Sequence, residues 1–475
     1  MSSLNLIIST GLNALETENT SSVPELAPVC EVTKEVIIAA GESASAEVDV
    51  LKAVAEVEST EELVTTQEKV VVETQNVVAS MESFIGTPVT KSEAMLIRNM
   101  VVGASLGMYQ AEKVVGSLES FGTDVCTDDA LNAGLEGLGE FIQNSVAKLG
   151  ELRKVLSAKF VGFFKDAFLS IDKIDRRADA VLAMSKGTDG DSNSSTLQLP
   201  LDLAWRLTRE GKVVSNLPKE VVELGKQVKA LFKDNADAMD KDRKRLVDLV
   251  TPLPNADGKQ ALEIARKIAA FKIPNPSFAT IKVPTASTSI DIFRGAEMLG
   301  GKAIFISVPK PVDVGDSLRK GLDACINNVM RSQVETEEMT KRQAKVDCAF
   351  DTLTPAEITR LAEDVKAVLQ DISSYKKSYS SWDADHKEID RVMEIVYSVT
   401  WDGDEFEVDT DDQGFVKRNP INHMMADAIY MLNQQYNYYT VGPIYYMMSE
   451  VIPVLNRILE VCERSLATYP TNNLK

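Results

Sequence analysis

The stretch that most constrains the fold is "KFVGFFKDAFLSIDKIDRRADAVLAM", residues 159 to 184, in which apolar side chains recur at the helical period. A helix of this pattern must bury its apolar stripe to be stable. Fully burying one Phe contributes roughly 1.5–3 kcal/mol, so the four phenylalanines indicate a packing element of a helical bundle. The stripe consists of Leu152, Val155, Leu156, Phe160, Phe163, Phe164, Ala167, Phe168, Ile171, Ile174, Ala178, Val181 and Leu182.

The polar face of the same helix decides what the stripe packs against. A helix that lies on a membrane surface carries Lys and Arg almost exclusively on that face. Here acids and bases alternate, which indicates a solvated face with i,i+4 ion pairs. The net charge of −20 also disfavours anionic membranes and broad nucleic-acid binding. We therefore predict that Phe160, Phe163, Phe164 and Phe168 pack against helices of this chain or of a partner protein. The alternating charges are Lys165, Asp166, Asp172, Lys173, Asp175, Arg176, Arg177 and Asp179.

Other helical patterns fill most of the chain. Residues 1 to about 60 are instead acidic and rich in Ser, Thr, Val and Ala, which is typical of a solvated or loosely held segment. Helical spacing begins near residue 60, and "TKSE" at 90–93 is a capping box that opens another helix. "SKGTDGDSNSST" is typical of a flexible linker. One long or two shorter helices are expected over 203–250.

Three short β-branched runs interrupt the helices between residues 276 and 310, which predicts a small sheet. Helices then resume, and "TPAE" at 354–357 combines an N-cap Thr, a first-turn Pro and a capping Glu. The run 401–419 has the pattern of a β-hairpin, and two helices close the chain. The predicted class is mainly α: multi-helix bundles with a small antiparallel β element in the second half and a late hairpin.

Five domains or segments are expected from these patterns. Residues 1–88 form an acidic amino-terminal segment that is flexible or removed by processing. Residues 89–184 form a helical domain with the Phe-rich helix, and 185–200 a linker. Residues 201–350 form a helical region that holds the β element 276–310, and 351–475 form a helical carboxy-terminal domain with the hairpin 401–419.

The last two helices are rich in Met and Tyr, among them Tyr445, Tyr446 and Met447. Met repacks easily and Tyr combines an apolar body with a polar tip, so such a surface suits adaptable partner binding. The same residues equally suit an ordinary core at the end of a bundle. Both interpretations remain open from the sequence.

No pattern indicates catalysis, a cofactor or a metal. The two histidines, His386 and His423, lack metal-site spacing, and no nucleotide-binding or nucleophile motif occurs in a suitable setting. The segment 409–416 resembles part of a calcium loop, but Pro420 stands where the bidentate acid is needed. The five cysteines form no CxxC pair, so reduced, buried thiols are expected. The amino terminus lacks a secretory signal pattern, and a cytoplasmic origin is expected.

Two blocks together resemble the internal head proteins of large tailed bacteriophages, of the jumbo myophage type. They are "LEGLGEFI…KLGELRKVLSAKFVGFFKDAFLSIDKIDRRADAVL" and the later "LGGKAIFISVP" followed by a helix, and the layout matches over residues 125–475. The resemblance implies a non-enzymatic protein packaged inside the capsid and ejected with the genome. It also implies trimming by a head protease after Ser/Ala/Gly-x-Glu, a form that Glu47, Glu61 and Glu82 complete.

The leading hypothesis is therefore a phage virion protein of the head interior that acts by protein–protein packing. Its expected partners are other virion or capsid proteins, the head maturation protease and further copies of itself, without sequence-specific nucleic acid or membrane. It would pass through the host cytoplasm during assembly. One alternative is a helical interaction or host-modifying protein that is delivered to or made in the host cytoplasm. Another is a metal-dependent enzyme built on the acidic hairpin and His386.

Overall fold

The computed structural model describes most of the chain and divides it into two compact units. Of the described residues, 49–166 form the first unit, and 34–48 with 167–470 form the second. Helices α2 (Lys34–Glu82) and α5 (Asp128–Lys186) each contribute to both units. The described stretches are residues 34–82, 128–188, 190–311, 315, 317–339, 346–399, 401, 409–410, 416–418 and 421–470.

The Phe-rich stretch forms the carboxy-terminal half of α5, as its period predicts. Phe163, Phe164 and Phe168 are each at most 7% exposed, and Phe160 is half-buried. The rings of Phe163 and Phe164 meet edge to face, with their centroids 5.3 Å apart. Such a pair adds to the stabilisation from burial alone. The buried residues repeat at seven-residue spacing in three rows: Ala167, Ile174 and Val181; Phe164, Ile171, Ala178 and Ser185; and Phe163, Ser170, Arg177 and Met184.

Helix α2 begins earlier than the sequence predicts, because the acidic segment from Lys34 onward is helical. The prediction weighed net charge, whereas Ala, Glu and Lys are strong helix formers and the segment holds many of them. A strict seven-residue repeat of buried side chains also runs along this helix. Its members are Val36, Ser43, Val50, Val57 and Val64.

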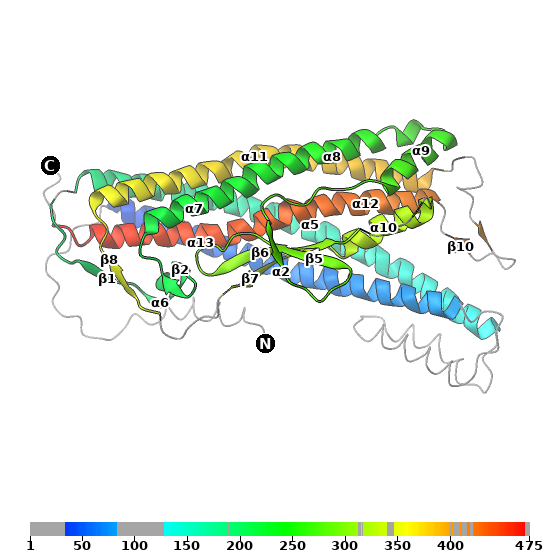
Figure 1. The fold of residues 1–475 in the computed structure, drawn as a ribbon, viewed down its shortest axis with the longest axis horizontal. Coiled ribbons are helices and arrows are strands. Elements are labelled where there is room, and N and C mark those ends of the chain that lie inside the picture. The colour runs from blue at the N-terminus through cyan, green and yellow to red at the C-terminus, as the bar shows by residue number, and fades with distance from the viewer. Residues whose placement is uncertain are drawn as a thin grey trace. The chain divides into compact units, whose positions relative to one another are not determined.

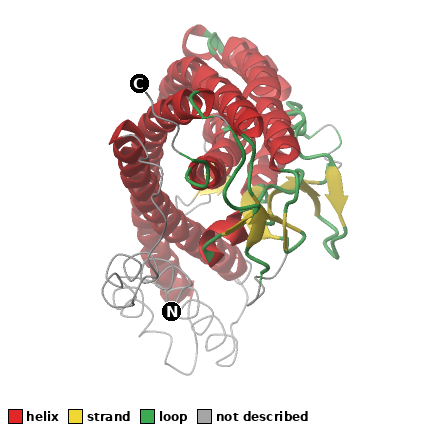
Figure 2. Cartoon of the chain, turned by 90° about the vertical axis from the view of Figure 1, so that its left-hand side faces the viewer, coloured by secondary structure: helices red, strands yellow, loops and turns green. Residues whose placement is uncertain are grey.

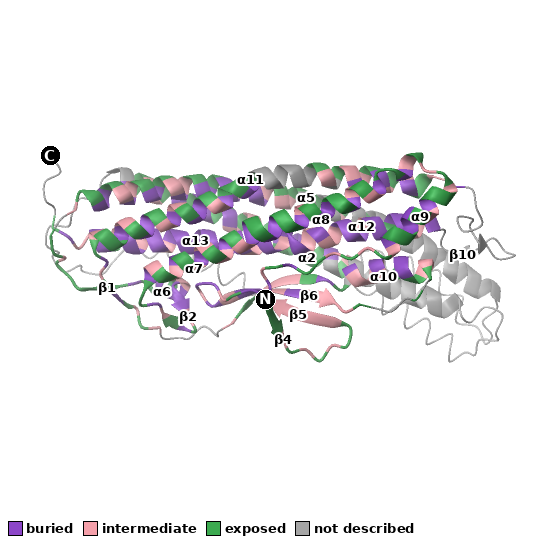
Figure 3. Ribbon diagram, turned by 45° about the horizontal axis from the view of Figure 1, so that its top comes forward, coloured by how far each residue is buried: buried purple, intermediate pink, exposed green. Residues whose placement is uncertain are grey.

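Three long rods form the centre of the second unit. The first is α7, a π-helical turn and α8, the second is α11, and the third is α12 followed by α13. Figure 1 shows α12 and α13 lying between α7, α8 and α11 on one side and the sheet on the other, and α8, α11 and the sheet contact them. Most residues of α13 are buried (Figure 3). The bounds are α7 Leu217–Lys229, the π-helix Ala230–Asn235, α8 Ala236–Val250, α11 Pro355–Ser398, α12 Ile421–Tyr439 and α13 Val441–Leu466.

The π-helical turn ends with a buried amide side chain, Asn235, which lies next to the break between α12 and α13. Asn235, 0% exposed, donates from Nδ2 to the carbonyl of Tyr439 at 2.9 Å, at the end of α12. Its Oδ1 accepts from the backbone N–H of Ser277 at 3.1 Å. Thr440 breaks the helix between α12 and α13, with φ −125° and ψ −70°. Asn235 thus satisfies backbone groups that the break and the adjacent loop leave without helical partners.

A four-stranded antiparallel sheet lies beside the helices of this unit (Figure 2). Its order is β4-β5-β6-β7, and the first three strands confirm the predicted β element. Strand β7 was not predicted, because three Glu residues, which are depleted in strands, surround its β-branched Val334 and Thr336. The strand bounds are β4 Ile281–Val283, β5 Ile290–Arg294, β6 Lys302–Pro309 and β7 Gln333–Glu338. The 3₁₀ turn Leu253–Asn255 and helix α9 (Gly258–Ala269) precede the sheet in the chain, and helix α10 (Leu318–Met330) connects β6 to β7.

The helix predicted from residue 203 is wrong in its first part. Only α6, Leu201–Arg206, is helical there, and the hairpin of β2 (Thr208–Arg209) and β3 (Lys212–Val213) follows. Glu210 and Gly211 both have positive φ, 52° and 76°, which a two-residue type I′ hairpin turn requires. Gly211 provides that conformation at no steric cost.

The segment 185–200, which the sequence predicts to be a flexible linker, is held in place. Strand β1 (Thr196–Gln198) pairs with β8 (Ala349–Asp351), and Asn193 donates its N–H to the carbonyl of Thr468 at 2.8 Å. The predicted domain boundaries themselves stay predictions. Helix α11 confirms the predicted capping box at Thr354, where Thr354 and Glu357 bond reciprocally.

The late hairpin is confirmed by the antiparallel pair β9 (Asp409–Thr410) and β10 (Val416–Arg418). The turn between these strands lies outside the described residues, as does the helix expected after the capping box at 90–93. The mainly α class with small antiparallel β elements is confirmed.

We expect Asn235→Ala to lower the free energy of unfolding by about 1–3 kcal/mol for each buried partner that it leaves unsatisfied. Urea unfolding followed by helical circular dichroism measures this change. The matched control is Lys233→Ala, since Lys233 is exposed on the same turn and its replacement should shift stability by less than about 0.5 kcal/mol. Equal stabilities of the two variants would contradict the role of Asn235.

Candidate functional site

The structure buries most of the residues that the sequence predicts to pack against a partner. Phe163, Phe164 and Phe168 of α5 are buried. In α13, Tyr445 is 0% and Met447 5% exposed, whereas Tyr446 is half-buried. These α13 side chains therefore lie in the chain's own interior, which favours the core interpretation of the Met- and Tyr-rich end. A partner-packing role for them stays a prediction.

The three candidate cleavage residues all lie on α2. Glu47 is 5% exposed and Glu61 is half-buried, while the side chain of Glu82 lies outside the described residues. Glu47 belongs to the second unit and Glu61 to the first. Of these residues, Glu47 is part of a buried polar cluster, and this cluster is the candidate functional site of the chain.

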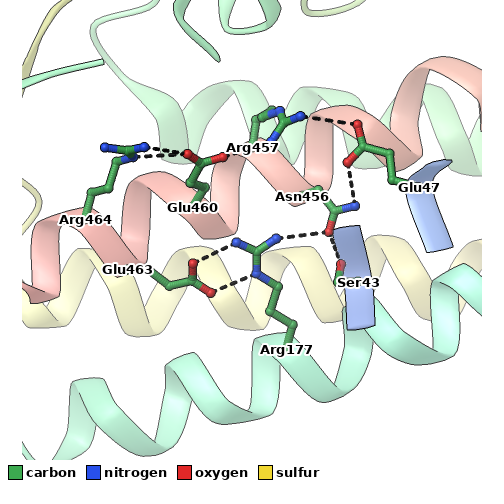
Figure 4. Close-up of polar contacts among 8 residues, drawn as sticks. All are labelled: Ser43, Glu47, Arg177, Asn456, Arg457, Glu460, Glu463 and Arg464. Atoms are coloured by element: carbon green, nitrogen blue, oxygen red, sulfur yellow. Dashed lines mark hydrogen bonds and ion pairs between the residues drawn. The ribbon is translucent and has the colours of Figure 1, made fainter. Parts of the chain in front are cut away.

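Eight residues from three helices make up the cluster, which we name the Arg177 cluster (Figure 4). α2 supplies the first two, α5 supplies the arginine, and one stretch of α13 supplies the other five. Three carboxylates and three guanidinium groups balance its charge. The members are Ser43, Glu47, Arg177, Asn456, Arg457, Glu460, Glu463 and Arg464.

The strongest contact in the Arg177 cluster is a bidentate ion pair between α5 and α13. Arg177 donates from Nε and Nη2 to the two carboxylate oxygens of Glu463, at 2.8 and 2.7 Å. The side chains are 6% and 14% exposed, so solvent screens the pair little. Bidentate Arg–carboxylate pairs combine charge with fixed geometry. This contact therefore fixes both the distance and the rotation of α5 against α13.

Asn456 lies at the centre of the Arg177 cluster and is 1% exposed. Its Oδ1 accepts from Nη1 of Arg177 at 3.3 Å and from the hydroxyl of Ser43. Its Nδ2 donates to Oε2 of Glu47 at 3.0 Å. One amide thus joins α2, α5 and α13: its oxygen accepts from α5 and α2, and its nitrogen donates to α2 (Figure 4).

Glu47 also contacts Arg457, whose Nη2 lies 3.5 Å from Oε1. Arg457 donates from Nη1 to Glu460 at 2.9 Å, and Glu460 accepts two more bonds from Arg464 at 3.1 and 2.9 Å. Burial by itself lowers the pKa of Arg457, but the carboxylates of Glu47 and Glu460 raise the pKa overall. The Arg457 guanidinium therefore stays charged at its half-buried position.

The sequence prediction for Arg177 is wrong. It assigns Arg177 to the solvated face beside Arg176, whereas the structure buries Arg177 and leaves Arg176 exposed. The seven-residue spacing from Phe163 through Ser170 to Arg177 would have indicated a buried position. The sequence does not predict Glu463 and Asn456 as partners of Arg177, because no local pattern links residues that lie so far from it in the chain.

A second buried polar group lies on α8. The hydroxyl of Tyr436 donates to Oδ2 of Asp242 at 2.7 Å, and Arg245 pairs with the same carboxylate. Burial raises the pKa of the Tyr436 phenol, and the hydrogen bond to Asp242 raises it further. Next to it, Arg243 is 1% exposed and pairs with Asp240 and Asp385 at 3.1 and 3.3 Å. These contacts join α8 to α12 and α11.

A groove of about 590 Å³ runs between α5 and α11. Ile171, Leu182 and Leu369 form part of its lining, and Lys366 bridges two carboxylates of α5 there. The Nζ of Lys366 lies 3.0 Å from Asp175 and 2.6 Å from Asp179. Lys366, the basic side chain in the described lining of the groove, is thus already paired, and Asp172 and Glu363 line the groove as further acids.

The described residues offer few groups suited to chemistry. Burial raises the pKa of the Cys325 thiol to about 11, which keeps it protonated and unreactive. His423 stacks on Tyr397 with ring centroids 4.2 Å apart, and burial lowers its pKa. The side chain of His386 lies outside the described residues. Within the described stretches, no cluster of three or more His, Cys, Asp or Glu side chains has the geometry of a metal site. None of the helices described there has the length and apolar character of a membrane-spanning segment.

We expect Arg177→Met to lower the free energy of unfolding by about 3–5 kcal/mol, because it leaves the buried carboxylate of Glu463 without its partner. Arg176→Met is the matched control on the same helix. Arg176 is 64% exposed and pairs with Glu42 at 3.6 Å, a contact worth about 0–1 kcal/mol. Urea unfolding of both variants measures the difference, and similar losses would show that the bidentate pair carries no special weight.

The family model described as phiKZ-like phage internal head proteins matches residues 50–464. No curated protein and no solved structure matches the chain. The matched region includes α5, the sheet and nearly all of α13, which together carry most of the contacts described above. The chain therefore belongs to the phiKZ-like phage internal head proteins, a family of structural proteins of the virion head.

Proposed function

We propose that the chain is packaged in the head interior together with the genome, is ejected with it, and acts there by protein–protein packing. During assembly it resides in the host cytoplasm. Its partners are other virion or capsid proteins. No catalytic step is part of this function.

The observation that supports packing as the mode of action is that the aromatic and Met side chains of α5 and α13 are buried in contacts between helices. The Phe-rich stripe of α5 and the Met- and Tyr-rich helix α13 are both engaged in helix contacts. In the Arg177 cluster, acids and bases neutralise each other, and Asn456 uses both ends of its amide. These groups hold helices together and leave little free to act on a substrate.

The charge of the chain favours protein partners over the genome. A net charge of −20 repels packed nucleic acid unless counterions or other proteins offset it. Contacts to DNA phosphates would need clustered Lys and Arg. In the Arg177 cluster the arginines are already paired with carboxylates of the same chain.

Maturation by the head protease is part of the proposal, with Glu47, Glu61 or Glu82 as the residue before the cut. A cut at any of the three separates Ser43 and Glu47 from the rest of the chain. Asn456 and Arg457 would then lose the partners that α2 supplies. Because Glu47 is buried, the bond that follows it is reached only when the start of α2 leaves α13.

Mass spectrometry of purified particles tests packaging and maturation separately. We expect peptides from the region 128–470, and a mature amino terminus at residue 48, 62 or 83. Particles analysed after genome release should contain less of the chain. Absence of the chain from particles would refute packaging, whereas a packaged chain with an intact acidic leader would refute maturation alone.

A further inference from the structure

Strand β6 has the composition of a strand that is covered on both faces. Ala303, Ile304, Phe305 and Ile306 are consecutive apolar residues, and successive side chains of a strand point to opposite faces. An antiparallel sheet with one wet face shows alternating apolar and polar residues instead. The sequence of β6 therefore indicates a cover on each face of the sheet.

One face of the sheet, the inner face, has its cover within the second unit. Ile306 of β6 is 0% exposed and belongs to the hydrophobic core, and Phe293, Val308 and Val334 pack against the same core. Their strand pairings place all four on this face. Helices α12 and α13 contact the sheet here, and Lys302 pairs with Glu450 of α13 at 2.5 Å.

The outer face is also apolar, but its residues are not members of the core cluster that contains Ile306. At one end Ala303 is buried, and the rest is half-buried or exposed, with Ile281 42% exposed. None of its larger apolar residues is a member of the core cluster under α12 and α13. The strand pairings assign to this face the apolar residues Ile281, Val283, Ile290, Ile292, Ala303, Phe305 and Pro309.

Two opposite charges flank the centre of the outer face. Arg294 of β5 and Glu335 of β7 both stand directly opposite Phe305 of β6, so they lie in one row across the sheet. With strands about 4.8 Å apart, the backbones of the two residues are about 10 Å from each other, with Phe305 between them. Among the described residues neither makes an ion pair, and Arg294 has only the carbonyl of Gly295 at 3.5 Å. Burial raises the pKa of Glu335, and Glu337 raises it further, so an external cation would suit this site.

We propose that the outer face of the β4–β7 sheet binds the same face of a second copy of this chain. A two-fold axis that runs along β6 between two facing sheets brings the Phe305 side chains together. The same rotation places β5 of each copy over β7 of the other and leaves every residue at the same position along the strand direction. Arg294 of each copy therefore lies over Glu335 of the other. Facing sheets pack about 10 Å apart, a distance that these side chains fill.

The self-complementary charge pattern is the reason to favour a second copy as the occupant. An interface around a two-fold axis uses one patch twice, so the patch must carry both members of each pair, as this row does. Pairing through the exposed edge of the sheet is less favourable. Lys282 lies within β4 and Pro284 follows it, and both residue types blunt strand edges.

Charge reversal tests this interface in the purified full-length chain, by sedimentation velocity and by size-exclusion chromatography with light scattering. We expect a dimer for the native sequence. Arg294→Glu alone and Glu335→Arg alone each place like charges opposite one another twice, and each should raise the dimer dissociation constant at least about tenfold. The matched control is Arg266→Glu, which replaces an exposed arginine of α9 that makes no ion pair with the residues the structure describes, and it should leave the dimer unchanged.

Mixing the two single variants gives the decisive result. Each pair of opposed side chains is then Glu with Arg, so we expect a heterodimer although neither variant dimerises alone. The double variant Arg294→Glu with Glu335→Arg should likewise dimerise. Melting temperatures close to that of the native chain establish that the variants fold. A native chain that is monomeric at micromolar concentration would overturn the proposal, since other residues of the chain or another protein would then cover the face. Dimers whose dissociation constant is unchanged by every charge reversal would overturn it as well.

Discussion

Burial of α13 on nearly every side is the constraint on which the second unit depends. A helix that is apolar around most of its circumference must be surrounded, because each exposed apolar side chain would forgo its transfer free energy. Tyr445, Val461 and Cys462 lie on different sides of this helix, because successive residues are about 100° apart around its axis, yet each is 0% exposed. Helix α11 and the inner face of the sheet contact α13 directly, and ion pairs and hydrogen bonds join it to α5 and to the start of α2.

Apolar contacts alone would leave the axial positions of these rods weakly determined, since Val, Ile and Leu can exchange places at similar cost. Buried polar groups discriminate far more sharply, because a wrong register leaves a charge or an amide without a partner. Asn456 and Arg177 have this effect at one end of the rods, and Tyr436 with Asp242 has it further along. Asn235 fixes the level at which α12 gives way to α13. Polar contacts thus set the register of a bundle whose stability comes mainly from apolar burial.

Periodicity predicted the local elements well and their partners poorly. The two helices that close the chain, the cap of α11 at Thr354 and the first three strands of the sheet follow from short-range patterns. Strand β7 did not, because its ladder with β6 stabilises a Glu-rich stretch of low β propensity. The burial of Arg177 and Glu47 depends on residues some 280 and 410 positions away, which no single-sequence pattern links. A seven-residue repeat through Ser43 was present and was masked by the acidic composition around it.

The remaining physical tension is between charge and association. A chain of net charge −20 repels its own copies, so any stable contact between copies must combine apolar burial with local charge pairing. The chain as a whole carries 71 Asp and Glu residues against 51 Lys and Arg residues. The row of Arg294, Phe305 and Glu335 is different, because its charges sum to zero and its centre is aromatic. Long-range repulsion is screened within about 8–10 Å at physiological salt, whereas pairing at contact distance in a partly dehydrated interface is not. The counterions that accompany packed DNA would screen the repulsion further, so crowding in a filled head would favour such contacts over free chains.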